Sequence, residues 1–286
     1  MKSKVRSSRR GRRRRRIIFG VGGALLGVLL VSAVFVSLLR WQARTLSDQT
    51  PPIVYDDQTE IEDMDEERAL NEILARYYDA VSSELGLDRL GSYHVGGVYV
   101  LPDGSRLDFS LVKKAPNQVR FSINRRGVRV IQAFNGETAW EARKFSGELV
   151  EATPRDPEEL PELMRNAWAT SDLYEPEEKG LSLRYAGTVD FHGREAYEIV
   201  GEHESGGTTR FFLDAETFYE LGRVSNIELD GEWVEEESIM SGHAAVDGFV
   251  FPHRVETYRG GELMQTQEVT ELQVNQGLFD WFFEKP

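Results

Sequence analysis

The sequence predicts an α+β fold in which a curved antiparallel sheet wraps round one helix, behind an N-terminal transmembrane segment. Three observations predict it. A charge-free apolar run lies near the N-terminus, an apolar stripe with helical spacing follows, and after Gly86 apolar residues recur at every second position. About ten strand-like runs separated by turn residues are expected, which is typical of a sheet-rich domain.

Residues 1–16 form a basic tail that contains ten Lys and Arg and no acid. The chain from Ile17 onward therefore holds 24 basic residues against all 48 acidic ones. The overall pI near 5.0 averages these two unlike parts. Because the large acidic part would repel phosphate backbones, we do not expect it to bind nucleic acid.

Residues 17–39 predict a transmembrane helix. These 23 residues carry no charge, and at 1.5 Å per residue they would span roughly 34 Å, enough for a hydrocarbon core of about 30 Å. The basic tail places the N-terminus in the cytoplasm by the positive-inside rule. A cleaved signal peptide is the alternative, although its apolar core is usually only about 7–15 residues long. Either interpretation exports the rest of the chain.

Residues 40–64 contain Pro51-Pro52 and many acids, which predicts a flexible acidic spacer. The exported domain is expected to cover residues 65–286 and to begin with a helix from about Asp65 to Leu85. Its apolar positions share one stripe, so this helix should lie against a sheet. The stripe consists of Leu70, Ile73, Leu74, Tyr77, Val81 and Leu85.

Alternation predicts strands near residues 107–112, 119–124 and 128–134, separated by turns such as Asn135-Gly136. Residues 157–169 have helical spacing. Strands are expected again from Leu181 to Val274, including one continuous strand over 249–258. The short turns between neighbouring runs indicate an antiparallel meander.

The sequence offers no catalytic or metal-binding motif. It contains no cysteine, no G-x-S-x-G, no G-x-x-x-x-G-K-[ST] and no H-E-x-x-H. The five histidines are not at ligand spacing, and the acids around Glu236 alternate between both faces of a strand, so we expect no metal and no cofactor. A non-enzymatic protein is favoured over a hydrolase with an unrecognised site.

Aromatic residues on the predicted strands are the candidate site. Each one taken singly is best explained as part of a filled core. Taken together, inward aromatics on a half-closed sheet could line an apolar cavity for acyl chains, and a filled core requires the same residues. The eight candidates are Phe109, Phe121, Phe134, Trp140, Tyr197, Phe211, Phe249 and Phe251.

Residues 246–256, with the sequence VDGFVFPHRVE, resemble the d-G-x-x-x-P-x-r-i-e strand of bacterial outer-membrane lipoprotein-sorting proteins, the periplasmic lipoprotein-carrier-like (LolA-like) superfamily. Five further segments agree with that family in chain order, so the resemblance covers about residues 66–286. They are 116–120 (PNQVR), 134–140 (FNGETAW), 193–197 (GREAY), 212–217 (FLDAET) and 274–286, where Val274-Asn275 precedes Phe279 and Pro286.

The resemblance implies an incomplete β-barrel closed by helices around an apolar cavity, in proteins that carry lipids or lipoproteins across the periplasm or sense the envelope, without catalysis. It leads us to expect a non-enzymatic inner-membrane protein with its main domain in the periplasm. Its expected partners are the membrane, a lipid or lipoprotein ligand, and other envelope proteins. This chain differs from a diffusing carrier in its predicted tether, whose flexible spacer would reach roughly 25 Å. An interaction or signalling scaffold with a filled core is the alternative.

Overall fold

A computed structural model describes residues 61–286 except 84, 205, 230 and 231. The predicted basic tail, the predicted transmembrane segment 17–39 and nearly all of the predicted spacer lie outside the described residues. Within the described part of the chain, no helix combines the length and hydropathy needed to cross a bilayer.

The predicted long helix is present as α2 (Glu66–Ser82). It begins after Asp65, whose side chain accepts a hydrogen bond from the Arg68 backbone N–H at 3.0 Å. The helix ends about one turn earlier than predicted, because Ser83 adopts a positive φ of 50° and leaves the helical conformation before Gly86. Ile73 and Tyr77 of the predicted stripe are buried, and Leu70, Leu74 and Val81 pack against the same core. Leu85 differs from the prediction, because it lies beyond the end of the helix and is 48% exposed.

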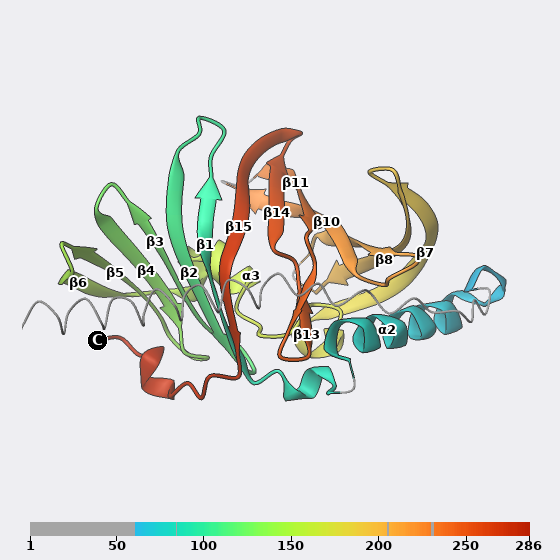
Figure 1. The fold of residues 1–286 in the computed structure, drawn as a ribbon, viewed down its shortest axis with the longest axis horizontal. Helices are drawn as coiled ribbons and strands as arrows, with labels where there is room; N and C mark the ends of the chain where they lie inside the picture. Colours follow the sequence, from blue (N-terminus) through green and yellow to red (C-terminus); the bar gives the residue numbers. More distant parts are fainter. Residues whose placement is uncertain (1–60, 84, 205, 230–231) are drawn as a thin grey trace, which may run out of the picture. The chain divides into compact units, whose positions relative to one another are not determined.

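The described residues form a thirteen-stranded antiparallel sheet and a separate two-stranded sheet (Figure 1). The large sheet has the order β6-β5-β4-β3-β2-β1-β15-β14-β11-β10-β9-β8-β7. The strands are β1 (Ser92–Val100), β2 (Arg106–Lys114), β3 (Gln118–Arg125), β4 (Val128–Phe134), β5 (Ala139–Phe145), β6 (Glu148–Arg155), β7 (Leu181–Phe191), β8 (Arg194–His203), β9 (Thr208–Asp214), β10 (Glu220–Leu229), β11 (Glu232–Ser241), β12 (Ala244–Val246), β13 (Phe249–Phe251), β14 (Arg254–Arg259) and β15 (Glu262–Val274).

The sheet is curved and open. Its edge strands β6 and β7 do not pair with each other, so the described strands do not close into a barrel (Figure 1). The remaining helices are short: α3 (Pro161–Arg165) and the 3-10 turns η1 (Ile61–Asp63), η2 (Leu87–Arg89), η3 (Pro157–Glu159), η4 (Pro176–Lys179) and η5 (Asp280–Phe282). The predicted curved antiparallel sheet with few helices is therefore confirmed.

The helical character predicted for residues 157–169 is present as two short pieces, η3 and α3, of which α3 begins at Pro161 and ends before Asn166. One prediction about a strand was wrong. The single strand expected over 249–258 is broken at Pro252-His253, where proline lacks an N–H for the ladder. Its first part becomes β13, which pairs with β12, while its second part becomes β14 in the large sheet.

The first and last long strands meet in the middle of the sheet. Strand β1 pairs with β15 from Tyr93↔Val274 to Val100↔Thr266. Asn275 secures this junction, because its side-chain oxygen accepts the backbone N–H groups of Gly91 and Ser92 at 2.8 and 3.1 Å. Its amide also donates to the Arg89 carbonyl at 2.9 Å. These bonds hold the start of β1 to the end of β15.

We predict that Asn275→Ala lowers the free energy of unfolding by about 1–3 kcal/mol, because it removes three side-chain hydrogen bonds. Asn275 has a φ of 54°, so Asn275→Gly is the control that removes the same bonds while tolerating the backbone conformation. Urea denaturation of both variants checks this. A wild-type midpoint for Asn275→Gly would show that only the backbone conformation, and not the bonding, matters.

His243 occupies a packing position rather than a metal site. Its ring stacks on Tyr219 with centroids 5.1 Å apart, and no group of metal-ligating side chains occurs among the described residues. Burial lowers the pKa of His243 to about 4, with smaller contributions from the charges of Arg194 and His253 in the same direction.

We predict that protonation of His243 destabilises the fold in mild acid. Between about pH 6.5 and 4 the unfolded chain binds a proton that the folded chain excludes, so stability is complete above pH 6.5 and falls as pH falls. The expected loss at pH 5 is on the order of 1–2 kcal/mol. Urea denaturation at pH 7 and pH 5 measures it, and His243→Gln should flatten the difference. An equal pH dependence in the variant would contradict the assignment.

Candidate functional site: the inner face of the sheet

The strand register places side chains of distant strands on one face of the sheet. Paired residues of an antiparallel sheet point to the same side, as do alternate residues of one strand. Phe211 of β9 pairs with Arg223 of β10. The residues that share their phase continue across β11, β14 and β15 to Tyr99 of β1 and Leu107 of β2, so all these side chains point to the same side of the sheet. We call this side the inner face, and it is the side that α2 covers.

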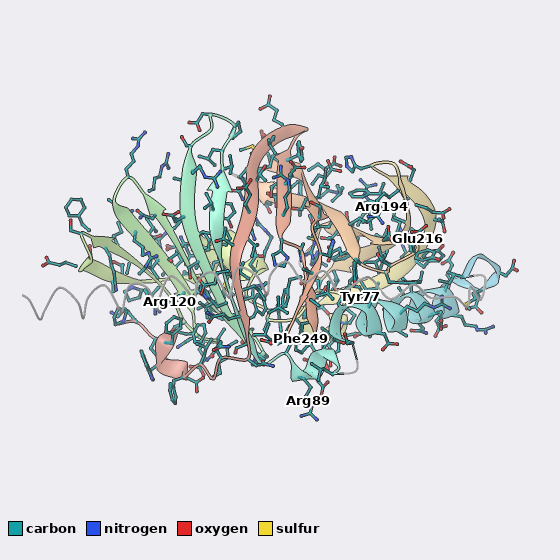
Figure 2. The ribbon with its side chains drawn as sticks, viewed as in Figure 1. Tyr77, Arg89, Arg120, Arg194, Glu216 and Phe249 are labelled. Carbon is teal, nitrogen blue, oxygen red and sulfur yellow. The ribbon has the colours of Figure 1, made fainter. Side chains whose placement is uncertain are left out.

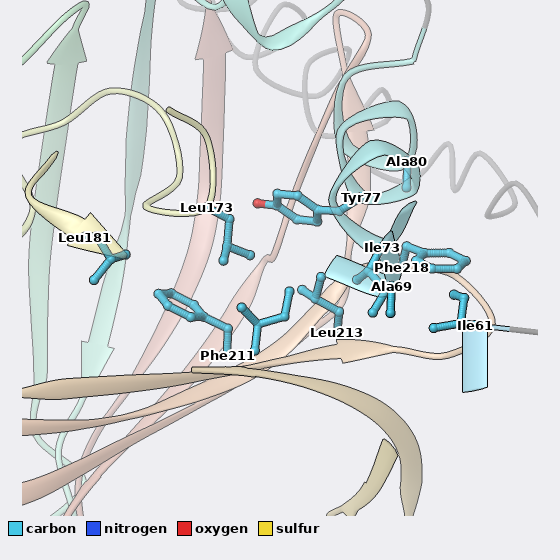
Figure 3. Close-up of a cluster of buried hydrophobic side chains, with 11 residues drawn as sticks. Ile61, Ala69, Ile73, Tyr77, Ala80, Leu173, Leu181, Phe211, Leu213 and Phe218 are labelled. Carbon is cyan, nitrogen blue, oxygen red and sulfur yellow. The ribbon is translucent and has the colours of Figure 1, made fainter. Parts of the chain in front are cut away.

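Helix α2 fills the inner face over β7 to β9 (Figure 3). Ile73 and Tyr77 of the helix lie in one buried cluster with Ile199 and Phe211 of the sheet. The rest of the cluster is Ile61, Ala69, Ala80, Leu173, Leu181, Leu213 and Phe218. The half of the inner face beneath α2 is therefore a packed core.

An ion cluster borders this core. Arg223 binds the two carboxylate oxygens of Glu220 at 2.7 and 3.0 Å and a carboxylate oxygen of Asp172 at 3.0 Å. Burial acts to lower the pKa of Arg223, but the charges of Glu220 and Asp172 raise it overall, so the guanidinium stays charged. Covering these charges with an apolar ligand would cost desolvation free energy. We therefore expect an apolar ligand to bind over β1 to β5, on the side of the ion cluster away from α2.

The chain between α3 and β7, residues 166–180, crosses the inner face beside this cluster, and we call it the crossing loop. Lys113 of β2 donates to the Trp168 carbonyl at 3.0 Å, and Lys179 donates to backbone carbonyls within the loop. Tyr78 of α2 donates to the Leu173 carbonyl at 2.6 Å. Burial lowers the pKa of both lysines to about 8. The loop thus links α2 to β2.

Over β1 to β5 the inner face is only partly covered. Leu160, Leu163 and Ala167 pack on Val119 and Phe134. The β12–β13 hairpin places Phe249 in a second cluster, together with Leu90, Val95, Phe109, Leu272 and Val274. These two clusters occupy the ends of β1 to β4 that lie closer to the crossing loop.

Several apolar side chains of this half are only half-buried, and we call five of them the inner apolar surface. They are Tyr99, Leu107, Phe121, Ile123 and Val130. The ring of Tyr99 lies 4.5 Å from the Phe109 ring and 6.4 Å from the Phe121 ring, measured between centroids. Neighbouring strands thus present a continuous apolar area that the described chain covers only in part.

The eight predicted site residues do not share one cavity. Tyr197 and Phe211 belong to the core beneath α2. Phe109, Phe121, Phe134, Phe249 and Phe251 lie in or against the two clusters of the other half. Only Phe121 also belongs to the inner apolar surface.

Trp140 lies on the opposite, outer face of the sheet. It pairs with Ala133 while its neighbour Ala139 pairs with Phe134, so Trp140 and Phe134 point to opposite sides. Its indole N–H donates to the Phe283 carbonyl at 2.7 Å. Trp140 therefore has no part in an inner-face site.

The C-terminal segment is fastened to the outer face by Trp140 and Arg120 (Figure 2). Arg120 donates to the Phe282 carbonyl at 2.7 Å, and its guanidinium lies 4.5 Å from the centroid of the Phe282 ring. Phe283 is completely buried, whereas Phe279 and Trp281 are 69% and 70% exposed. The segment thus presents a pair of stacked, exposed aromatic rings.

Neither of two pockets on the described part of the chain is lined by a predicted site residue. One, of about 230 Å³, lies on the outer face between His94, Val112 and Phe282. The other, of about 420 Å³, lies between the β1–β2 and β3–β4 turns, and it includes Leu107 and three arginines.

Solved structures share this architecture. A lipoprotein-sorting protein domain from Vibrio parahaemolyticus matches with a TM-score of 0.52 and 10% identity, over 75% of this chain and 94% of that one. A LolA superfamily protein from Nitrosomonas europaea matches at 0.52 and 11%, over 76% and 97%. The chain has a LolA-like fold. A DUF1329 family protein from Desulfovibrio piger matches this LolA-like fold at 0.52 and 13%, over 77% and 98%. No protein-family model and no curated protein matches the sequence.

The motifs that carry the family resemblance have structural roles in the LolA-like fold. Asp214 accepts hydrogen bonds from the backbone N–H and the hydroxyl of Thr217, both at 2.8 Å, and so shapes the β9–β10 turn. Arg120 and Trp140 fasten the C-terminal segment, and Asn275 secures the β1–β15 junction. The residues that carry the resemblance therefore indicate the fold and do not mark a ligand site.

Sequence reasoning missed most of the inner apolar surface. Leu107, Ile123 and Val130 have the same strand phase as the predicted aromatics, so their alternation could have identified them. Tyr99 gave no signal, because Gly96-Gly97 interrupts the pattern of β1. A Cβ at Gly97 would lie 2.9 Å from the Phe109 ring, so this position requires glycine for packing.

We predict that Trp140→Phe loosens the C-terminal segment. The variant keeps an aromatic ring but loses the hydrogen bond to the Phe283 carbonyl, which should cost about 1 kcal/mol and speed hydrogen exchange in residues 276–286. Trp233→Phe is the matched control, because Trp233 is 57% exposed. Exchange mass spectrometry compares the two variants. Unchanged exchange in Trp140→Phe would show that the indole N–H does not hold the segment.

Proposed function

We propose that this protein is a membrane-tethered, non-enzymatic envelope protein that binds the acyl chain of a lipid or lipoprotein on the inner apolar surface. The observation that carries the proposal is the half-buried apolar area of β1 to β4 on a LolA-like fold. Structures of the same fold include a lipoprotein-sorting protein domain. A role in lipoprotein sorting or transport follows from the same proposal.

The inner apolar surface suits a flexible chain better than a compact ligand. Its side chains come from four neighbouring strands and point to one side, so they form a band that crosses the strands. Each methylene that such a band removes from water contributes about 0.8 kcal/mol. A ligand several methylenes long would thus gain useful affinity without any polar contact.

The proposed tether is the apolar segment 17–39, with the main domain on the periplasmic side of the inner membrane. Its support is the 23-residue charge-free run and the basic tail before it. A tethered domain would exchange lipid with the membrane or with a neighbouring envelope protein within reach of its spacer. Lipid or lipoprotein and other envelope proteins are therefore the proposed partners.

An interaction or signalling scaffold is the second candidate. The exposed, stacked rings of Phe279 and Trp281 favour it, because large exposed aromatics are characteristic of interaction surfaces. The filled core beneath α2 also agrees with it. In this case the domain would carry no lipid, and a protein would bind the C-terminal segment.

The two candidates differ in what the folded domain carries. We would express the full chain with a protease site between Thr45 and Leu46, so that the domain folds in place and is then released without detergent. Native mass spectrometry followed by organic extraction should detect one bound lipid per domain. Phe121→Glu and Ile123→Glu should each lower the lipid-bound fraction about tenfold or more, because a carboxylate then faces the acyl chain.

Trp233→Glu is the matched control, because Trp233 is 57% exposed and lies on β11, outside β1 to β4. It should carry lipid like the wild type. Ile123→Glu guards against a folding artefact, since Ile123 lies outside the buried clusters that Phe121 contacts. Wild-type lipid content in both folded inner-face variants would refute the acyl-binding proposal. A lipid-free wild-type domain with a stoichiometric bound protein would favour the scaffold.

A further inference from the structure

Strands β2 and β3 separate at one end and leave a cavity between them. Their pairing ends at Phe109↔Ile123, although β2 continues to pair with β1 as far as Arg106 and β3 with β4 as far as Arg125. The cavity of about 420 Å³ fills this gap, and we call it the strand fork. The facing edges of residues 106–108 and 124–125 take no part in the β2–β3 ladder, so their backbone polar groups are available to a ligand.

Three arginines gather at the strand fork of this acidic domain. Arg106, Arg125 and Arg126 line it. Arg106 is paired with Glu268 at 3.0 Å, whereas Arg125 and Arg126 take part in no ion pair among the described residues. Unpaired guanidinium groups with accessible N–H donors are well suited to bind phosphate oxygens.

Two carboxylates also line the fork and oppose an anion there. Asp103 is engaged in its own turn, where its side chain accepts the Ser105 backbone N–H at 2.8 Å. The side chain of Asp108 has no hydrogen-bond partner among the described residues, and it has the strand phase opposite to that of Leu107. Because Glu268 already neutralises Arg106, the fork arginines without an ion pair among the described residues are Arg125 and Arg126.

Arg126 has a left-handed backbone conformation, which is unfavourable for a residue with a side chain. Its φ is 54°, in the left-handed region where a long side chain costs roughly 1 kcal/mol relative to glycine. Gly127 follows it in the β3–β4 turn, also with positive φ. Arg126 therefore adds charge at this turn at a cost in stability, and Arg126→Gly can remove the charge without harming the turn.

The fork adjoins the inner apolar surface. Leu107 belongs to both, and Ile123 immediately precedes the fork residue Asn124. A molecule whose acyl chain lies along Phe121 and Ile123 would therefore reach the fork with its polar end. Charge at that end would meet Arg125 and Arg126.

We propose that the strand fork binds the phosphate group of an anionic lipid whose acyl chain lies on the inner apolar surface. The proposal rests on the proposed acyl binding and adds to it the class of headgroup. Arg125 and Arg126 are its specificity-determining residues, with Arg106 and the free backbone N–H groups of the fork as further donors. A free phosphate is the other source of the same chemistry.

The test uses the released domain, stripped of lipid, and two lipids with identical acyl chains. Phosphatidylglycerol carries an anionic phosphate, whereas diacylglycerol has the same acyl chains and no phosphate. We expect phosphatidylglycerol to bind roughly tenfold more tightly at low salt, the value of one or two charge-assisted hydrogen bonds at a partly exposed site. The preference should shrink when NaCl rises from about 0.05 to about 0.5 M, because screening weakens exposed charge pairs.

Arg125→Gln and Arg126→Gly should each lower the affinity for phosphatidylglycerol several-fold and leave that for diacylglycerol unchanged, because diacylglycerol has no phosphate for them to bind. Arg184→Gln is the matched control, because Arg184 is an exposed arginine on the edge strand β7, far along the sheet order from β2 and β3. Its affinities should equal those of the wild type. Since glycine favours the backbone at position 126, reduced binding by Arg126→Gly is not a folding defect.

Equal affinity for the two lipids, or a preference unaffected by both variants, would overturn the headgroup assignment and leave the acyl-binding proposal intact. No binding of either lipid would instead refute acyl binding itself. Glycerol phosphate, which lacks acyl chains, separates the two phosphate sources. It should bind far more weakly than phosphatidylglycerol, and equal binding would identify the fork as a site for free phosphate and contradict the lipid assignment.

Discussion

The pairing of β1 with β15 joins two runs of strands that the chain makes separately, and the rest of the fold depends on it. On one side of it lie β2 to β6, and on the other lie β14, β11 and the run from β10 to β7. Residues some 180 positions apart must meet, so the entropic cost of closing this long loop is paid before the sheet is complete. The Asn275 hydrogen bonds act at this point, where the two runs become one curved surface.

That curvature gives the inner face two unequal halves. Helix α2 fills the half over β7 to β9, and the ion cluster around Arg223 ends its packed core. Over β1 to β4, helix α3, the crossing loop and the β12–β13 hairpin cover the inner face only in part, and Tyr99, Phe121 and Ile123 stay half-buried. Incomplete cover of a curved sheet thus creates both the apolar surface and its boundary.

The two proposed contacts of a lipid arise from one geometric feature. Where β2 and β3 stop pairing, the apolar inner face ends and a polar fork begins. An apolar surface next to a polar fork fits an amphipathic ligand, because the acyl chain and the phosphate of such a ligand are also adjacent. The outer face has a different role, because its Arg120 and Trp140 are engaged with the C-terminal segment. Phe279 and Trp281 remain exposed there for a protein partner.

The sequence by itself determined the local features of this protein. The apolar stripe of α2, the period-two runs of β2 to β4 and turns such as Asn135-Gly136 are local, because backbone preference and side-chain spacing set them within a few residues. Motifs whose residues serve turns and junctions, such as Asp214 and Asn275, also indicated the LolA-like fold.

Only the tertiary structure decided which apolar residues stay uncovered. Phe211 and Phe121 have the same alternation, yet α2 buries Phe211 whereas Phe121 stays half-buried. The register of β5 with β4 places Trp140 on the outer face, and the sequence of β5 has no clear apolar alternation that could have predicted it. The strand fork depends on where two hairpins separate, a feature of register between strands that no single strand encodes.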